Sequence, residues 1–131
     1  MNSINELIKN SNCKTLKGVS EEVIRNAEEE LKFKFDDDYK NFLKNFGVLS
    51  CGGNEIFGLG VEGYLNVIKI TKEERILNPN ILDNYIVIQD YNIEGILITL
   101  DQKGIVYEFR NGKNTKIYNS FNKFLENEIL N

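Results

Sequence analysis

The sequence has no histidine and no tryptophan, and it contains a single proline. Without histidine, no pair of a nucleophile and an imidazole base can be built, and no Ser or Cys stands in a recognisable nucleophile motif. The two cysteines, Cys13 and Cys51, have neither C-x-x-C spacing nor the histidine partners of a zinc site. We expect them to be reduced, half-buried thiols rather than a disulfide or a redox pair. These absences argue against an enzyme and against a bound metal.

Long hydrophobic runs are missing as well. The longest, such as residues 96–98, are far shorter than a membrane span requires, and the N-terminus shows no apolar signal region, so a cytoplasmic protein is expected. Blocks of basic residues are also absent, since 16 Lys and Arg stand against 20 Asp and Glu, with a net charge of −4. This balance disfavours nucleic-acid binding and suits a basic protein partner better.

What remains is the composition of an ordinary globular protein, with 41% hydrophobic and 27% charged residues. A chain of 131 residues is long enough for one adequate core, and it shows no linker, repeat or low-complexity tract. We therefore expect one domain over residues 1–131.

The first half of the chain carries helix signals. Residues 2–9 form a short amphipathic helical segment with Ile4, Leu7 and Ile8 on one side. Ser20 is placed as an N-cap, Val19 and Ile24 form a hydrophobic staple around it, and the stripe predicts a helix to about Lys32.

A second helix begins with Asp36 or Asp37 as its cap and ends at Gly47. Its apolar residues recur at the spacing of one helix face. They are Tyr39, Phe42, Leu43 and Phe46.

The second half reads mainly as strands. The segment 64–77 fits either a strand or a capped helical turn, and Pro79 breaks whatever precedes it. Asn111-Gly112 is typical of a type I′ hairpin, and Ser120 caps a terminal helix. The strand-like runs are 55–57, 85–89, 96–100, 105–109 and 115–118. The pattern predicts an α+β fold, with N-terminal helices and a C-terminal helix packed on an antiparallel sheet of four to six strands.

Three motifs invite a chemical interpretation, and each has a simpler one. Residues 58–63 match G-x-G-x-x-G with Asp83 downstream, but the extended character of residues 64–70 favours a structural glycine loop over a dinucleotide site. Residues 28–30 cannot converge on one metal ion, because successive helix positions diverge, and capping at a helix start explains 36–38. Capping and a solvated face are preferred for both triplets, with a partner-facing acidic patch as the next alternative and a metal site last. Residues 101–104 suit a hairpin turn better than a nuclease motif.

Most aromatic residues fall on predicted inner faces, where core packing is the default. Tyr91, in a polar turn, is the aromatic residue we most expect to be exposed, since tyrosine is also a favoured interface anchor. The residues assigned to the core are Tyr39, Phe42, Phe46, Phe57, Phe109, Phe121 and Phe124.

Several segments, taken in order, resemble the SUKH superfamily of Smi/Knr-like domains. They are IRNAEEEL (24–31), DDDYKNFL (36–43), GNEIFGL (53–59), TKEER (71–75), YIVI (85–88) and SFNKFL (120–125). The chain departs from the family in having Asp36 where proline is common at the start of the second helix. It also lacks the tryptophan that many members carry.

The resemblance implies a binding protein with no cofactor and no catalytic residues. Members are largely known as bacterial immunity proteins that block a cognate toxin, often a nuclease or deaminase, by direct contact. Partner-binding candidates on strand ends and loops are Glu55, Glu62, Asp90, Tyr91 and Glu94. Two alternatives stay open: a regulatory or scaffolding adaptor, as in eukaryotic relatives, and a small carboxylate-dependent hydrolase with a pocket of perturbed pKa.

Overall fold

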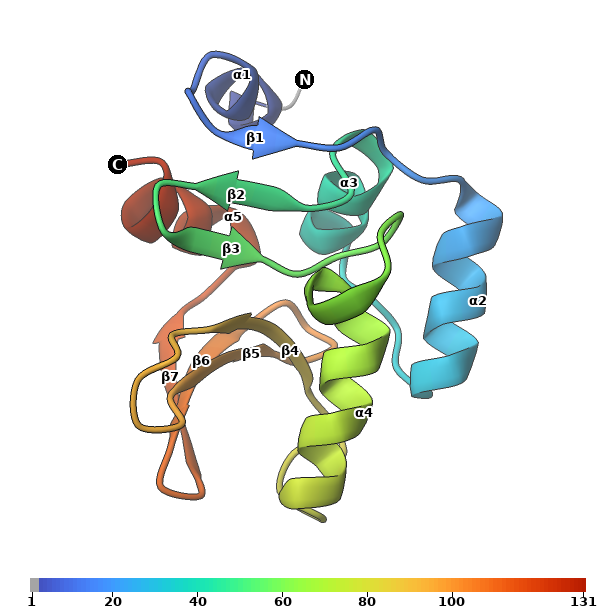
Figure 1. Cartoon of the computed structure of the whole chain (residues 1–131), viewed down its shortest axis with the longest axis vertical. Helices are drawn as coiled ribbons and strands as arrows, with labels where there is room; N and C mark the ends of the chain where they lie inside the picture. The colour runs from blue at the N-terminus through green and yellow to red at the C-terminus, as the bar shows by residue number, and fades with distance from the viewer. Residues whose placement is uncertain (1–2) are drawn as a thin grey trace.

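The computed structural model describes residues 3–131 and opens with three helices (Figure 1). The hydroxyl of Ser20 accepts a hydrogen bond from the Val23 N–H at 3.3 Å, and Asp36 accepts one from the Asp38 N–H at 3.1 Å, so both predicted caps are confirmed. The helices are α1 (Ser3–Lys9), α2 (Glu21–Leu31) and α3 (Asp37–Asn45). In α1 Ile4 and Ile8 are buried, whereas Leu7, expected on the same side, is 47% exposed.

Seven strands among the described residues form two antiparallel sheets, where the sequence predicted one. The class is α+β as predicted, and the second sheet is a meander in chain order. The first sheet contains β1 (Lys14–Thr15), β2 (Leu49–Cys51) and β3 (Asn54–Ile56); the second contains β4 (Ile86–Asp90), β5 (Leu97–Leu100), β6 (Val106–Arg110) and β7 (Lys113–Tyr118). Strands β1 and β2 were missed because runs of two and three residues carry no readable alternation.

The ambiguous segment 64–77 is helical. A 3-10 turn, η1 (Gly63–Leu65), leads into α4 (Val67–Leu77), which ends before Pro79 as predicted. The Asn66 side chain caps α4 by accepting from the N–H groups of Ile68 and Lys69, at 2.9 and 3.1 Å. This cap stabilises the start of a helix, although the run of β-branched residues that follows it favours a strand.

Thr71 and Arg75, in the segment that resembles the family, join α4 to its neighbours. The Thr71 hydroxyl accepts from the Val87 N–H at 3.0 Å. The Arg75 guanidinium donates to the carbonyls of Leu31 at 2.8 Å and Tyr85 at 3.0 Å. These bonds hold α2, α4 and β4 together, so both residues have a structural role.

The C-terminal helix begins where predicted, with the Ser120 hydroxyl accepting from the Lys123 N–H at 3.2 Å. It runs as α5 (Phe121–Phe124) and continues as a π-helical turn, η2 (Leu125–Ile129). It packs against α3 and β7, and in Figure 1 it is the red segment on the left, above the meander.

Aromatic rings from α3 and α5 form the centre of the core. The Tyr39 ring meets Phe121 edge to face at 5.2 Å, and Phe42 meets the same ring at 5.3 Å. The Tyr39 hydroxyl is fully buried and donates to the Phe57 carbonyl at 2.7 Å. Burial raises its pKa well above the ordinary value. All seven aromatic residues predicted for the core are buried.

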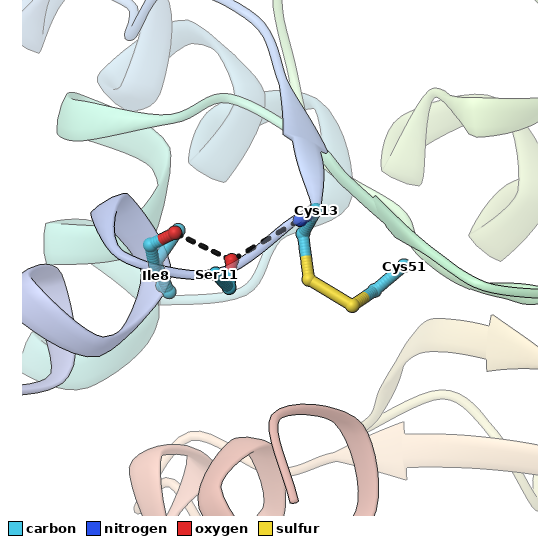
Figure 2. The surroundings of a disulfide bond; sticks show 4 residues. All are labelled: Ile8, Ser11, Cys13 and Cys51. Atoms are coloured by element: carbon cyan, nitrogen blue, oxygen red, sulfur yellow. Dashed lines mark hydrogen bonds between the residues drawn. A yellow bond between two sulfur atoms is a disulfide. The ribbon is translucent and has the colours of Figure 1, made fainter.

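The two cysteines are bonded to each other, which overturns the expectation of reduced thiols (Figure 2). Pairing of β1 with β2 places Lys14 opposite Ser50 and so brings Cys13 beside Cys51, with 4.4 Å between the Cα atoms. The Ser11 hydroxyl accepts from the Cys13 N–H at 3.2 Å and donates to the Ile8 carbonyl at 2.6 Å. The disulfide thus ties the N-terminal segment to the first sheet across 38 positions of sequence.

Candidate protein-binding surface

The β4–β5 loop, defined here as residues 90–96 and so including the last residue of β4, is held by its own hydrogen bonds. Asp90 accepts from the Asn92 N–H at 2.7 Å, and the Tyr91 N–H donates to the Ile96 carbonyl at 3.1 Å. Asn92 and Glu94 both adopt a left-handed backbone, with φ of 60° and 52°. Tyr91 is 37% exposed, as the sequence predicted, and Ile93 is 60% exposed. The loop therefore presents an aromatic and an aliphatic side chain from a defined backbone.

Carboxylates from distant parts of the chain lie near this loop. Partial burial, and then the negative charges of Glu128 and Glu108, raise the pKa of the Tyr91 phenol. Glu128 accepts a hydrogen bond from the Tyr118 hydroxyl, and Glu108 pairs with Arg110 at 3.0 Å. Sequence reasoning missed Glu108 and Glu128, because β6 and the C-terminal helix meet the loop only in the folded chain.

On the α4 side, Glu74 is the carboxylate that the sequence did not point to. Burial raises the pKa of Glu74, and the charge of Asp90 raises it further. Glu55 accepts a hydrogen bond from the Tyr64 hydroxyl at 2.7 Å, which raises the pKa of that phenol. Acidic groups therefore occur on both sides of the end of β4.

The five candidate residues fall into three places. Asp90, Tyr91 and Glu94 share the β4–β5 loop, while Glu55 lies on β3 and Glu62 is exposed before η1. A hydrogen bond of 3.1 Å between the side chains of Asn54 and Gln89 links β3 to β4 next to Glu55 and Asp90. Among residues 3–131, no hydrogen bond or ion pair joins Glu62 to the other four.

A separate polar cavity of about 390 Å³ lies where α3 begins. Burial, and then the charge of Asp38, raise the pKa of Asp36 to about 6. One Asp36 oxygen, Oδ1, is buried and has no hydrogen-bond partner among the described residues. The other lining residues are Asp37, Asp38, Gln102, Lys103, Gly104 and Ser120.

The remaining acidic motifs are used structurally. The Asp101 carboxylate accepts from the N–H groups of Lys103 and Ile105 and from the Tyr107 hydroxyl, which is the predicted turn. Glu28 is only 6% exposed, not on a solvated face, and accepts from the Phe35 N–H at 2.8 Å. Within the described part of the chain, no group of three or more acidic or cysteine side chains is placed to hold a metal ion.

The glycine motif at 58–63 needs a corrected argument, because a helix does come after it. The Val67 N–H at the start of α4 donates to the Gly58 carbonyl at 2.9 Å, and the Gly58 N–H donates to the Leu65 carbonyl at 2.9 Å. Asn66 occupies the next two helix N–H groups. The loop closes on itself, and β3 before it belongs to an antiparallel sheet, so a dinucleotide site is not formed.

No helix among residues 3–131 has the length and apolar character needed to cross a bilayer. The described residues also contain no histidine. The exposed Tyr91 and two acidic side chains, Asp90 and Glu94, lie together on a loop that is held by its own hydrogen bonds.

A family model described as "SMI1-KNR4 cell-wall" (SUKH_5) matches residues 1–130, and the chain belongs to this family. The family is associated with protein partners and is consistent with an immunity-protein-like function. No curated protein matches the chain. The crystal structure of a protein from Pseudomonas syringae pv. tomato has the same fold, with a TM-score of 0.84 and 15% sequence identity over 99% of this chain and 98% of that one. The resemblance read from the sequence is therefore confirmed.

Proposed function

We propose that the chain is an immunity protein that binds a cognate bacterial polymorphic toxin and neutralises it by direct contact. The match to the SUKH_5 family over residues 1–130 carries the proposal. The toxin is proposed to be a nuclease or a deaminase, whose nucleic-acid cleft is basic. An acidic surface opposite such a cleft would speed encounter and block access of the substrate.

The proposed contact surface consists of Glu55, Glu62, Asp90, Tyr91 and Glu94. Asp90, Tyr91 and Glu94 share one loop, and that loop is held by internal hydrogen bonds. A loop that is already ordered loses less entropy on binding than a mobile one. This supports the β4–β5 loop as the centre of the contact.

We place this action in the cytoplasm of the cell that makes the toxin. Disulfides are rare in that compartment, because the glutathione and thioredoxin systems keep thiols reduced, so the bond between Cys13 and Cys51 counts against this placement. Quenched alkylation of Cys13 and Cys51 in intact cells tests this placement. Mostly reduced thiols support it, and a fully oxidised pair would indicate an oxidising compartment.

Two other functions compete with immunity. An adaptor in a regulatory complex would use the same kind of surface with a partner that is not a toxin. A hydrolase is favoured by one observation, the cavity with Asp36 and its raised pKa. Asp36 is nevertheless the N-cap of α3, and the Ser120 hydroxyl is engaged in capping α5, so both have structural roles.

Affinity purification from the native host, followed by mass spectrometry, tests the proposal. One stoichiometric partner with toxin activity is expected, and the purified protein should inhibit that activity. Recovery of signalling or housekeeping proteins alone would favour the adaptor.

Charge reversal tests the surface itself. The triple variant E62K/D90K/E94K should lose inhibition without unfolding. The control E6K/E22K/E29K changes the net charge equally at exposed positions on α1 and α2, and it should inhibit normally. Full inhibition by the first variant would exclude this surface.

A further inference from the structure

Exposed large apolar side chains occur singly at several described positions, among them Leu7, Val23 and Tyr64, and at two places two of them lie close together in sequence. At the end of α4, Ile76 and Leu77 are 78% and 72% exposed. At the β4–β5 loop, Ile93 is 60% and Tyr91 37% exposed. A single exposed aliphatic residue needs no explanation, but one beside an exposed aromatic residue on an ordered loop has the character of an interface anchor.

The β4–β5 loop and the end of α4 differ in the charged residues that surround them. Asp90 and Glu94 flank Ile93 in the loop, and the charges of Glu108 and Glu128 reach Tyr91. The bases on β6 and β7 are Arg110, which pairs with Glu108, and Lys113 and Lys116, against the four carboxylates of Asp90, Glu94, Glu108 and Glu128. Acidic groups therefore predominate around an apolar centre. At the end of α4, by contrast, Arg75 directly precedes Ile76, and Glu73 is paired with Lys69.

The acidic triplet 36–38 provides an internal comparison. It is more densely charged than the loop, but the aromatic residues on its two sides, Phe35 and Tyr39, are buried. A partner held by charge alone would favour the triplet. A partner that also buries an apolar group would favour the loop.

We propose that the β4–β5 loop, centred on Ile93 and Tyr91, docks a basic protein segment in which Lys or Arg side chains flank an apolar hollow. This rests on the proposed immunity function and names the chemistry of the partner's contacting surface. Ile93 would enter the hollow while the carboxylates around it meet the basic rim, which is the usual arrangement of an apolar centre and a polar edge.

The probe is a short amidated peptide of alternating Lys and Leu, titrated into the ¹⁵N-labelled protein and followed by amide shifts. The largest shifts are expected at residues 90–95, with smaller ones at 36–38. Replacing Ile93 with Asn should weaken peptide binding at the loop roughly ten-fold, because the bound peptide can no longer bury the aliphatic side chain of Ile93. The matched variant I76N should bind as wild type does.

Two results would overturn the inference: shifts at 36–38 that equal or exceed those of the loop, or equal effects of I93N and I76N. The titration uses no toxin, so its outcome is independent of whether immunity is the function. If the peptide binds at the loop but the protein inhibits no toxin, the proposed function is refuted and the proposed docking surface is still supported. A protein that inhibits its toxin while I93N changes neither inhibition nor peptide binding would refute only the surface.

Discussion

The raised pKa of Asp36 makes a quantitative prediction about stability. The folded protein holds a proton on this carboxyl group up to about pH 6, whereas the ordinary value is 3.8. Between these values the native state binds more protons than the unfolded state, so the stability of the wild type falls as pH rises through this interval. Replacing Asp36 with Asn removes the titration but keeps a side chain that caps helices well.

The size of this effect on the free energy of unfolding follows from the difference of about two units between the pKa of Asp36 in the folded protein and its ordinary value. At ~1.4 kcal/mol per unit the upper limit is about 3 kcal/mol, and water near the open side of the cavity reduces this to ~1–3 kcal/mol. The stability of D36N relative to the wild type should therefore increase by ~1–3 kcal/mol between pH 4 and pH 7.5.

Urea unfolding followed by far-UV circular dichroism measures this difference across the pH range, with the disulfide kept intact. The control D37N removes a neighbouring exposed charge and should show no comparable trend. The comparison cancels pH effects that are common to both proteins. A difference between D36N and wild type that is the same at pH 4 and pH 7.5 would refute the reasoning about this cavity.

Three further changes test the packing. Replacing Cys13 and Cys51 with Ser should lower the free energy of unfolding by about 3–4 kcal/mol, because the closed loop spans 38 positions; a loss below about 1 kcal/mol in urea melts would contradict this. The variant Y39F should cost about 1–2 kcal/mol, because the Phe57 carbonyl loses its buried donor, and an unchanged urea midpoint would mean that another group satisfies it. Replacing Glu94 with Gly should raise thermal stability by ~0.5–1 kcal/mol, because φ is 52° there, and a lower melting temperature would show that the Glu94 side chain stabilises the loop.

The helices and the meander were predictable because their signals are local. Ser20 and Asp36 cap where the sequence places them, and Asn111-Gly112 has positive φ at both positions, as a type I′ turn requires. The helix at 67–77 was ambiguous because β-branched residues fill its buried face, and its deciding cap is a single Asn66 side chain. Local chemistry thus specified most elements and left one undecided.

The first sheet and the disulfide were not predictable, because both depend on contacts between distant segments. Cys13 meets Cys51 only because a two-residue strand pairs with β2. Glu28 looked like part of a solvated triplet, yet it is buried because the chain turns back and directs the Phe35 N–H at it. Such contacts leave no periodic trace in the sequence.

The candidate surface was partly predictable. Polar turn residues pointed to Asp90, Tyr91 and Glu94, and these do share one loop. Glu74, Glu108 and Glu128 lie near this loop but belong to other elements, and no local sequence pattern predicts that they come together. Ile93 was overlooked because a lone apolar residue in a polar turn gives no periodic signal.

The most direct test of the central claim is growth of cells that express the toxin recovered with this protein. Cells that make the toxin domain alone should die, and cells that also make this protein should grow normally. The purified pair should form a stable complex whose affinity falls as salt rises, because opposite charges contribute to binding. Death of the cells in the presence of well-folded protein, with no complex formed, would contradict immunity as the function.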